Sequence, residues 1–404
     1  MIDPAIFERP ASSDLAQRRS TKWTMYPPDV LPAFIAELDV PLAEPIARTL
    51  HEAIERSDTG YANPSALADA FAVFANARYG WRVEPAACFA VPDVMVGVVE
   101  TLRVLIEPGD GVAINTPVYP PFFSALDEIG ARRIEAPLAR DVTGAYDLDL
   151  ETLEAAFARG ARVFLLCNPH NPVGRAFSAT TLAAVAELAK RYDVAVLSDE
   201  IHAPLALAGA RAVPFVPIAE RVGTRALALV SASKAWNLAG LKCALGVAAD
   251  SDTARALARM PKEVRYRVGH LGALAAIAAF TEGVPWLDAL CAHLDRNRRL
   301  LGELLAAQLP SVGYVPPDAT YLAWLDCATL ALGDDPAKAF LREGRVAVSP
   351  GTDFGTLGAG FVRLNFGTTP TLLREIVARM ARAAYPVGNP PTSPRMPSPP
   401  RSSA

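Results

Sequence analysis

One lysine in this chain has surroundings that suit covalent catalysis. Lys234 follows an apolar run at 226–230. Small hydroxyl residues flank it and a second cation follows, at Ser231, Ser233 and Lys242. An amine at the end of a buried strand loses contact with water, which lowers its pKa and makes it a better nucleophile. The segment therefore predicts a Schiff-base lysine beside a phosphate site, although alone it also fits a surface lysine in a serine-rich loop.

Three other short apolar runs also end in polar residues. Runs at 112–115, 162–167 and 194–198 predict strands, with amphipathic helices such as 179–191 between several of them. This alternation is typical of a buried, mainly parallel sheet. The polar residues that follow these runs include Tyr119, Asn171, Asp199 and His202. Since parallel strands end at one edge of a sheet, we expect these clusters and Lys234 to converge.

Each cluster has a role if the ligand is pyridoxal 5′-phosphate (PLP). Lys234 would bind the aldehyde carbon of the cofactor. Asp199 would keep the ring nitrogen protonated, because a nearby carboxylate raises the pKa of that nitrogen. A protonated ring stabilises a carbanion. Asn171 would donate a hydrogen bond to the phenolic oxygen, and Tyr119 would stack on the ring.

The remaining groups suit the phosphate and an amino-acid substrate. Backbone N–H groups at a helix start and nearby polar side chains would bind the phosphate: Val94, Met95, Ser231, Ser233 and Lys242. Arg363 stands inside an apolar run at 361–366. Its fork-shaped guanidinium suits the α-carboxylate of a substrate.

The composition favours a protein with a large core over a nucleic-acid binder. The chain has 404 residues, of which 51% are hydrophobic, a net charge of −4 and no long basic block. We therefore expect no nucleic-acid partner. The five cysteines lack C-x-x-C spacing, which argues against a zinc site and for a reducing compartment. No signal peptide or membrane-spanning run is evident, so we expect a cytoplasmic protein.

The pattern changes along the chain. A long helical stretch over 252–308 is expected to break at 283–285, where glycine and proline stand. We expect an N-terminal segment packed on the small domain, a large PLP-binding domain, a small α+β domain and a disordered Pro/Ser-rich tail, at 1–44, 45–290, 291–385 and 386–404.

These motifs resemble those of fold-type I PLP enzymes of the class I/II aminotransferase superfamily. More narrowly, the chain is similar to the MalY/PatB group of cystathionine β-lyases over roughly residues 15–383. The narrower resemblance rests on Lys22-Trp23, Gly60-Tyr61 and the segments 35–39, 168–174, 198–202, 320–325 and 360–365. It implies an α/β fold, with a mainly parallel seven-stranded sheet between helices and a smaller α+β domain.

The resemblance also implies roles for individual residues. Lys234 would shuttle the α-proton of the substrate, and His202 would lie beside the phenolic oxygen of the cofactor. The substrate-binding residues would be Arg363, Asn171 and Asp39. Tyr61 would reach the phosphate of the neighbouring subunit's cofactor, which implies a homodimer with shared active sites.

Two reactions remain open on these residues. In β-elimination a thiolate leaves the β-carbon, and pyruvate and ammonia follow; in transamination the amino group passes to the cofactor. The subgroup motifs favour elimination, whereas Lys242 stands where aminotransferases tend to carry a basic phosphate ligand. Asp93 replaces the Gly or Ser that relatives usually carry, and we expect it to point away from the phosphate or cap a helix. A regulatory protein that keeps the fold could dispense with Lys234, which is present.

Overall fold

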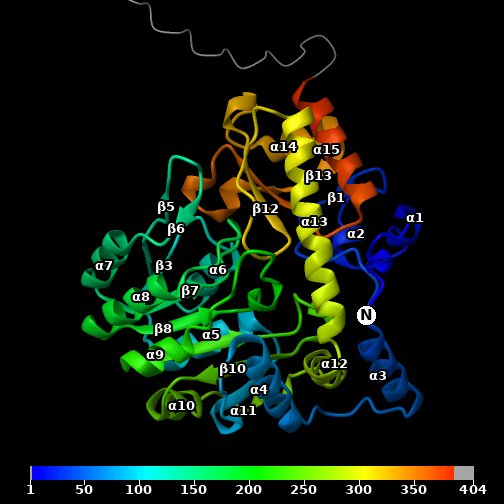
Figure 1. Ribbon diagram of the computed structural model, residues 1–404. Helices are drawn as coiled ribbons and strands as arrows, with labels where there is room; N and C mark the ends of the chain where they lie inside the picture. The colour runs from blue at the N-terminus through cyan, green and yellow to red at the C-terminus, as the bar shows by residue number, and fades with distance from the viewer. Residues whose placement is uncertain (1, 386–404) are drawn as a thin grey trace, which may run out of the picture.

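A seven-stranded sheet forms the centre of the computed structural model, which describes residues 2–385 (Figure 1). The expected disorder of the tail lies outside the described residues. The strand order is β2-β10-β9-β8-β7-β3-β4. The bounds in that order are Cys88–Val91, Ala244–Ala248, Ala226–Val230, Ala195–Asp199, Ala161–Cys167, Gly111–Ile114 and Arg132–Glu135. Only β10 runs antiparallel to its neighbours, so the expected mainly parallel sheet is confirmed.

Helices cover both faces of this sheet because neighbouring side chains on a strand point to opposite sides. Val112 and Val163 belong to one hydrophobic cluster, while Ala113 and Phe164 belong to another. Helices on the first face are α5 (Val94–Leu105), α6 (Pro121–Glu128), α10 (Ser251–Leu257) and α11 (Lys262–Tyr266). Helices on the second face are α7 (Leu150–Ala158), α8 (Ala179–Arg191) and α9 (Val216–Val222).

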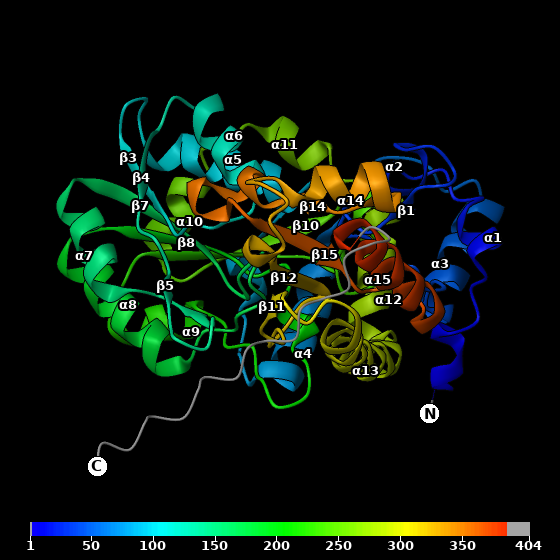
Figure 2. The same cartoon turned by 90° about the horizontal axis from the view of Figure 1, so that it is seen from above.

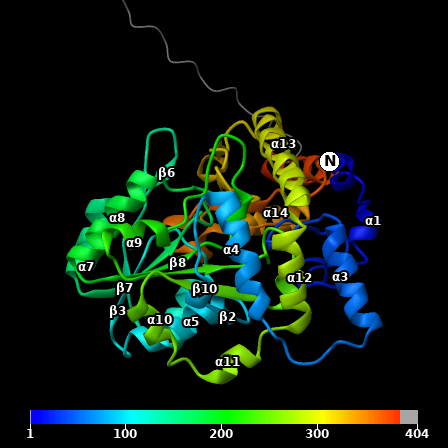
Figure 3. The ribbon, with the colours of Figure 1, turned by 60° about the horizontal axis from the view of Figure 1, so that its bottom comes forward.

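Three further helices extend the second face. They are α3 (Glu44–Glu55), α4 (Ser65–Tyr79) and α12 (His270–Thr281). Buried residues of β9 and β10 pack with α4 and α12 in one cluster. Figure 3 shows α12 between α3 and α4, and it contacts both.

A second, four-stranded antiparallel sheet lies in the other part of the molecule, in the order β11-β12-β15-β14. Its strands are Gly313–Tyr314, Leu322–Asp326, Phe361–Asn365 and Ser349–Pro350. The helices of this part are α13 (Val284–Gln308), α14 (Pro336–Gly344) and α15 (Pro370–Ala384). From above, α15 lies beside α13 (Figure 2).

The N-terminal segment joins this second part. Its β1 (Leu31–Pro32) pairs in parallel with β13 (Val346–Ala347). The short helices α1 (Ser12–Leu15) and α2 (Thr21–Thr24) precede β1. A hairpin of β5 (Ala139–Arg140) and β6 (Tyr146–Asp147) completes the elements.

The observed helix boundaries agree with the sequence predictions at some positions and differ at others. The helix predicted at 179–191 is α8, and α12 ends at Thr281 before α13 begins at Val284, so the expected break is confirmed. The stretch before that break is not one helix, because α10, α11 and α12 are separate. The expected domain boundary at 290/291 falls within α13, which links the two parts.

Within the described residues, no single helix is long and apolar enough to cross a membrane. One sharply bent pair of helices, α12 with α13, is long and apolar enough for a broken membrane span by length and composition alone. Most of α12 is buried in the core.

We predict that Gly272→Ala lowers the free energy of unfolding. A β-carbon added to Gly272 on α12 would lie 2.2 Å from the carbonyl oxygen of Leu241, so the backbone would have to move. Overpacking of this kind costs about 1–3 kcal/mol. Gly240→Ala is the matched control, since nothing lies within 4 Å of its added carbon. Equal urea midpoints for both variants would contradict this account of the α12 packing.

Candidate active site

The predicted strand-end residues meet at one cavity of about 270 Å³. The parallel strands β7, β8 and β9 all end at this edge, at Cys167, Asp199 and Val230. Of the predicted site residues, those that line the cavity are Val94, Met95, Tyr119, Asn171, Asp199, His202, Ser233, Lys234 and Lys242. The sheet edge therefore brings together groups as far apart along the chain as Val94 and Lys242.

Lys234 lies just beyond the end of β9, with its amine turned toward the N-terminal segment. Its Nζ donates a hydrogen bond to the carbonyl oxygen of Ala36 at 2.9 Å. Burial lowers the pKa of this amine to about 8, and the nearby positive charge of Arg363 acts in the same direction while Asp199 opposes it. Near neutral pH a useful fraction of this amine is therefore unprotonated and nucleophilic.

Asp199 ends β8 and presents a carboxylate to the same cavity. Its Oδ1 accepts a hydrogen bond from the backbone N–H of Ile201 at 3.1 Å. Burial raises its pKa to about 6. Among the described residues its Oδ2 accepts no hydrogen bond, so this oxygen is available to a cationic N–H group inside the cavity.

Asn171 is held in one orientation by Arg363. The Nη1 of Arg363 donates to Asn171 Oδ1 at 3.0 Å, and a guanidinium can only donate. The amide nitrogen of Asn171 therefore faces the cavity as a donor. Arg363 itself, at the centre of β15, is buried and does not line the cavity. Burial lowers its pKa to about 10, and it stays charged near neutral pH.

Tyr119 and His202 complete the polar part of the cavity wall. Burial raises the pKa of the Tyr119 hydroxyl. Burial, together with the charges of Lys234 and Arg363, lowers the pKa of His202 to about 3, so its ring is neutral. In the described part of the chain, the buried Nδ1 of His202 has no hydrogen-bond partner. A neutral imidazole with a free nitrogen can accept or donate one hydrogen bond toward a ligand.

The other end of the cavity lies at the start of α5. Asp93 caps this helix, since its Oδ1 accepts from the N–H of Val96 at 2.8 Å. Its Oδ2 forms an ion pair with Lys242 Nζ at 3.0 Å. The structure thus agrees with the expectation that Asp93 caps a helix, and it adds a pairing with Lys242 that the sequence did not predict.

Besides Arg363, three predicted site residues do not line the cavity. The hydroxyl of Ser231 donates to the carbonyl oxygen of Cys243 at 2.7 Å and is buried. Tyr61 is 87% exposed on the connection between α3 and α4. Asp39 is 1% exposed and pairs with Lys22 Nζ at 2.7 Å. None of these three side chains lines the cavity that contains Lys234.

The cavity wall also includes residues to which the sequence analysis gave no site role, among them Ala36 and Cys167. Ala36 contributes through its backbone carbonyl, which has no signature in the sequence. Cys167 lines the cavity beside Asp199, and burial raises the pKa of its thiol well above the ordinary value. It is therefore not a thiolate nucleophile.

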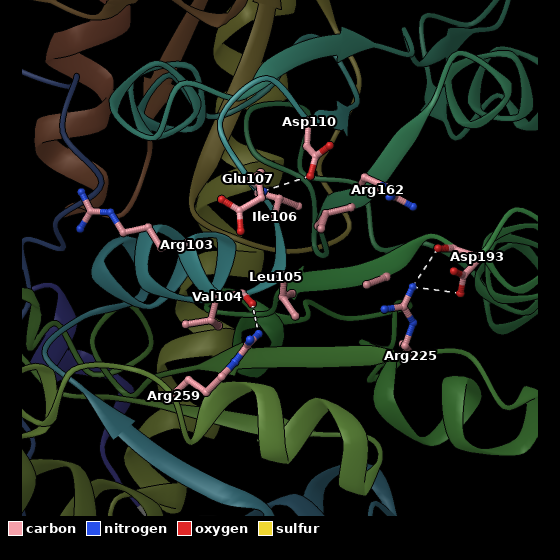
Figure 4. Close-up of a pocket in the computed structure, with 12 residues that line it drawn as sticks. Arg103, Val104, Leu105, Ile106, Glu107, Asp110, Arg162, Asp193, Arg225 and Arg259 are labelled. Atoms are coloured by element: carbon pink, nitrogen blue, oxygen red, sulfur yellow. Dashed lines mark hydrogen bonds and ion pairs between the residues drawn. The ribbon is translucent and has the colours of Figure 1, made fainter.

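A larger surface hollow, of about 550 Å³, lies at the opposite edge of the sheet (Figure 4). It is lined near the starts of β7, β8 and β9, and none of the predicted site residues lies there. Two of its arginines have partners: Arg225 pairs with Asp193, and Arg259 donates to the carbonyl oxygen of Val104. In the described residues no cluster of three or more His, Cys, Asp and Glu could hold a metal ion.

Comparisons with known proteins identify the family. The chain belongs to the family described as aminotransferase class I and II, whose sequence model matches residues 38–380. A Mycobacterium leprae protein that carries the provisional name cystathionine beta-lyase is 45% identical over 390 residues, covering 91% of this chain and 95% of that protein.

Two further relatives lie in the narrower group. The cystathionine beta-lyase PatB of Bacillus subtilis is 33% identical over 88% of this chain and 92% of its own length. A crystal structure from Corynebacterium diphtheriae, provisionally described as a PLP-dependent beta-cystathionase, superposes with a TM-score of 0.87 at 35% identity, covering 93% of this chain and 98% of that one. The expected superfamily and fold type are thus confirmed.

We predict that the amine of Lys234 reacts as a weak base with a pKa of about 8 in the protein without added cofactor. Its folded-state pKa is depressed, so the neutral form accumulates as the pH rises through 8 rather than through the ordinary value of 10.5. Brief labelling with acetic anhydride over a pH series, with the Lys234 peptide quantified by mass spectrometry, measures the midpoint. A midpoint near the ordinary lysine value would mean that the amine is hydrated.

Proposed function

We propose that this protein is a PLP-dependent cysteine-S-conjugate β-lyase. It would cleave cystathionine or a related conjugate to pyruvate, ammonia and a thiol. The observation that supports this most directly is that one cavity contains both the buried amine of Lys234, with a pKa of about 8, and the carboxylate of Asp199. Among the described residues one oxygen of that carboxylate accepts no hydrogen bond. The relatives named for this activity, at 45% and 33% identity over most of the chain, support the reaction type.

The donors and acceptors of the cavity suit the parts of PLP. The free oxygen of Asp199 suits a protonated pyridine nitrogen, and the free amide of Asn171 suits a phenolic oxygen. The start of α5 and the amine of Lys242 suit a phosphate. When bound, the cofactor supplies a protonated ring that takes up the electron pair left on the substrate's α-carbon.

The protein's own residues would then carry the proton and hold the substrate. Lys234, once free of the cofactor, removes the α-proton, for which a pKa of about 8 is well matched to neutral pH. Arg363 would bind the α-carboxylate with Asn171, whose side chain it already orients.

We further propose a homodimer in which Tyr61 of one subunit reaches the phosphate site of the other. The supporting observation is that the Tyr61 side chain is 87% exposed and has no aromatic or hydrogen-bond partner among the described residues. Large apolar side chains on α3, α4 and α11 are also exposed: Ile54, Val73 and Tyr266. All five cysteines are free, which agrees with a reducing compartment, and we propose a cytoplasmic location.

Transamination is the second candidate. The observation that favours it is Lys242, which lines the cavity at the expected phosphate end. Both reactions share the groups described above and differ in the proton transfer that follows removal of the α-proton.

We predict that the purified protein, loaded with PLP and given L-cystathionine without a keto acid, releases pyruvate and thiol over many turnovers. Lys234→Ala should lower this rate by at least about 10³-fold, since it removes both the covalent anchor and the proton carrier. Coupled measurement of pyruvate and free thiol checks the result. A single turnover that resumes only when a keto acid is added would establish transamination instead.

We predict that Asp93→Asn tightens the binding of PLP. Asparagine caps a helix as well as aspartate, but it removes an anion from the expected phosphate position and releases Lys242 from its ion pair. Lys242→Met should weaken binding, and the two effects, each about tenfold, should be opposite in sign. Titration of the cofactor-free protein with PLP gives both dissociation constants. Weaker binding by Asp93→Asn would mean that Asp93 serves to orient Lys242.

A further inference from the structure

A buried ion pair in the N-terminal segment has no part in the function proposed above. Lys22 Nζ donates to Asp39 Oδ2 at 2.7 Å, and both side chains are 1% exposed. Trp23 Nε1 donates to the second oxygen, Asp39 Oδ1, at 3.2 Å. Taking two charges out of water is costly, and such a pair commonly adds little net stability. The role of the ion pair is therefore better explained by the chain segment that it holds in place.

The pair holds the segment 34–39, which we call the strap. Lys22 Nζ also donates to the carbonyl oxygen of Glu37 at 3.0 Å, and the backbone N–H of Asp39 donates to the carbonyl oxygen of Gly367 at 2.8 Å. Asn237, three residues after Lys234, binds both the N–H and the carbonyl of Leu38, at 2.9 and 3.0 Å. The C-terminal end of the strap is therefore fixed from both sides.

The carbonyl groups of the strap accept hydrogen bonds alternately from the cations of the site and from Asn365. Phe34 accepts from Arg363 Nη2 at 2.8 Å, and Ala36 accepts from Lys234 Nζ at 2.9 Å. The two carbonyls between and after them, of Ile35 and Glu37, both accept from Asn365 Nδ2 at 2.7 Å. One row of strap carbonyls thus contacts both cations of the site.

We propose that Lys22 and Asp39 are positioning residues, whose ion pair holds the strap so that its carbonyl oxygens fix the amine of Lys234 and the guanidinium of Arg363. Asp39 would then act on the reaction without contact with the substrate, in place of the substrate-binding role expected from the sequence. The effect of this arrangement on the reaction rests on the proposed function. The position of the Lys234 amine does not depend on that function.

The strap also keeps water away from the amine. Ala36 forms part of the cavity wall beside Lys234. Loss of water is the main reason that this amine is a weaker base than an ordinary lysine. If the strap loosens, water reaches the amine and stabilises its charged form. The pKa of Lys234 then rises toward 10.5.

The test is the pH profile of Lys234 acetylation in the full chain without cofactor, measured for wild type and Asp39→Asn. We expect the midpoint to rise by about one pH unit, so that labelling at pH 7 becomes about tenfold slower. The control is Asp295→Asn on α13, which also breaks a buried ion pair, with Arg298 and Arg299, but lies outside the strap network. It should lower the melting temperature and leave the midpoint unchanged.

The proposal would be overturned if the pH profiles of Lys234 acetylation were the same for wild type and Asp39→Asn while the variant had a lower melting temperature. The ion pair would then have a purely structural role. If Asp39→Asn does not fold, Trp23→Phe keeps an aromatic ring but removes the hydrogen bond to Asp39 Oδ1, and it should give a smaller shift of the same sign. An unchanged midpoint for that variant would also overturn the proposal. Because labelling needs no cofactor or substrate, failure of the lyase assay would not alter either result.

Discussion

Burial of the Lys234 amine is the constraint on which the rest of the site depends. A second cation, Arg363, lies in the same water-poor region, and its positive charge lowers the pKa of the lysine further. Neutral oxygens satisfy both groups: Ala36 and Phe34 from the strap, and the amide oxygen of Asn171. A carboxylate in any of these places would hold the lysine protonated. The neutral partners instead leave the amine free to lose its proton.

The parallel sheet makes this arrangement predictable in part. Buried central strands appear in the sequence as short apolar runs, and the polar residues after them must lie at one edge. Asp199, Asn171 and Lys234 were found on that basis. The strands β4 and β10 gave a weaker signal, because β4 is an edge strand with mostly polar side chains and β10 is built largely of alanine and glycine.

Hydrogen bonds and ion pairs between residues distant in the sequence could not be predicted from the sequence. The hydroxyl of Ser231 looks available for phosphate, but it donates its hydrogen bond to the carbonyl oxygen of Cys243. Asp39 looks like a ligand for a substrate, but Lys22, 17 residues away, neutralises it in the core. Ala36 acts through its backbone, which every residue carries. Tyr61 is exposed and pairs with no aromatic ring among the described residues, so the role proposed for it would require a second chain.

The central claim is that Lys234, rather than the other lysine of the cavity, holds the cofactor. Reduction of the PLP-loaded protein with borohydride fixes the cofactor to the amine that binds it, and peptide mapping then locates it. We predict that the added mass lies on Lys234, whose amine is the buried weak base. Attachment to Lys242, which also lines the cavity but pairs with Asp93, would contradict the account.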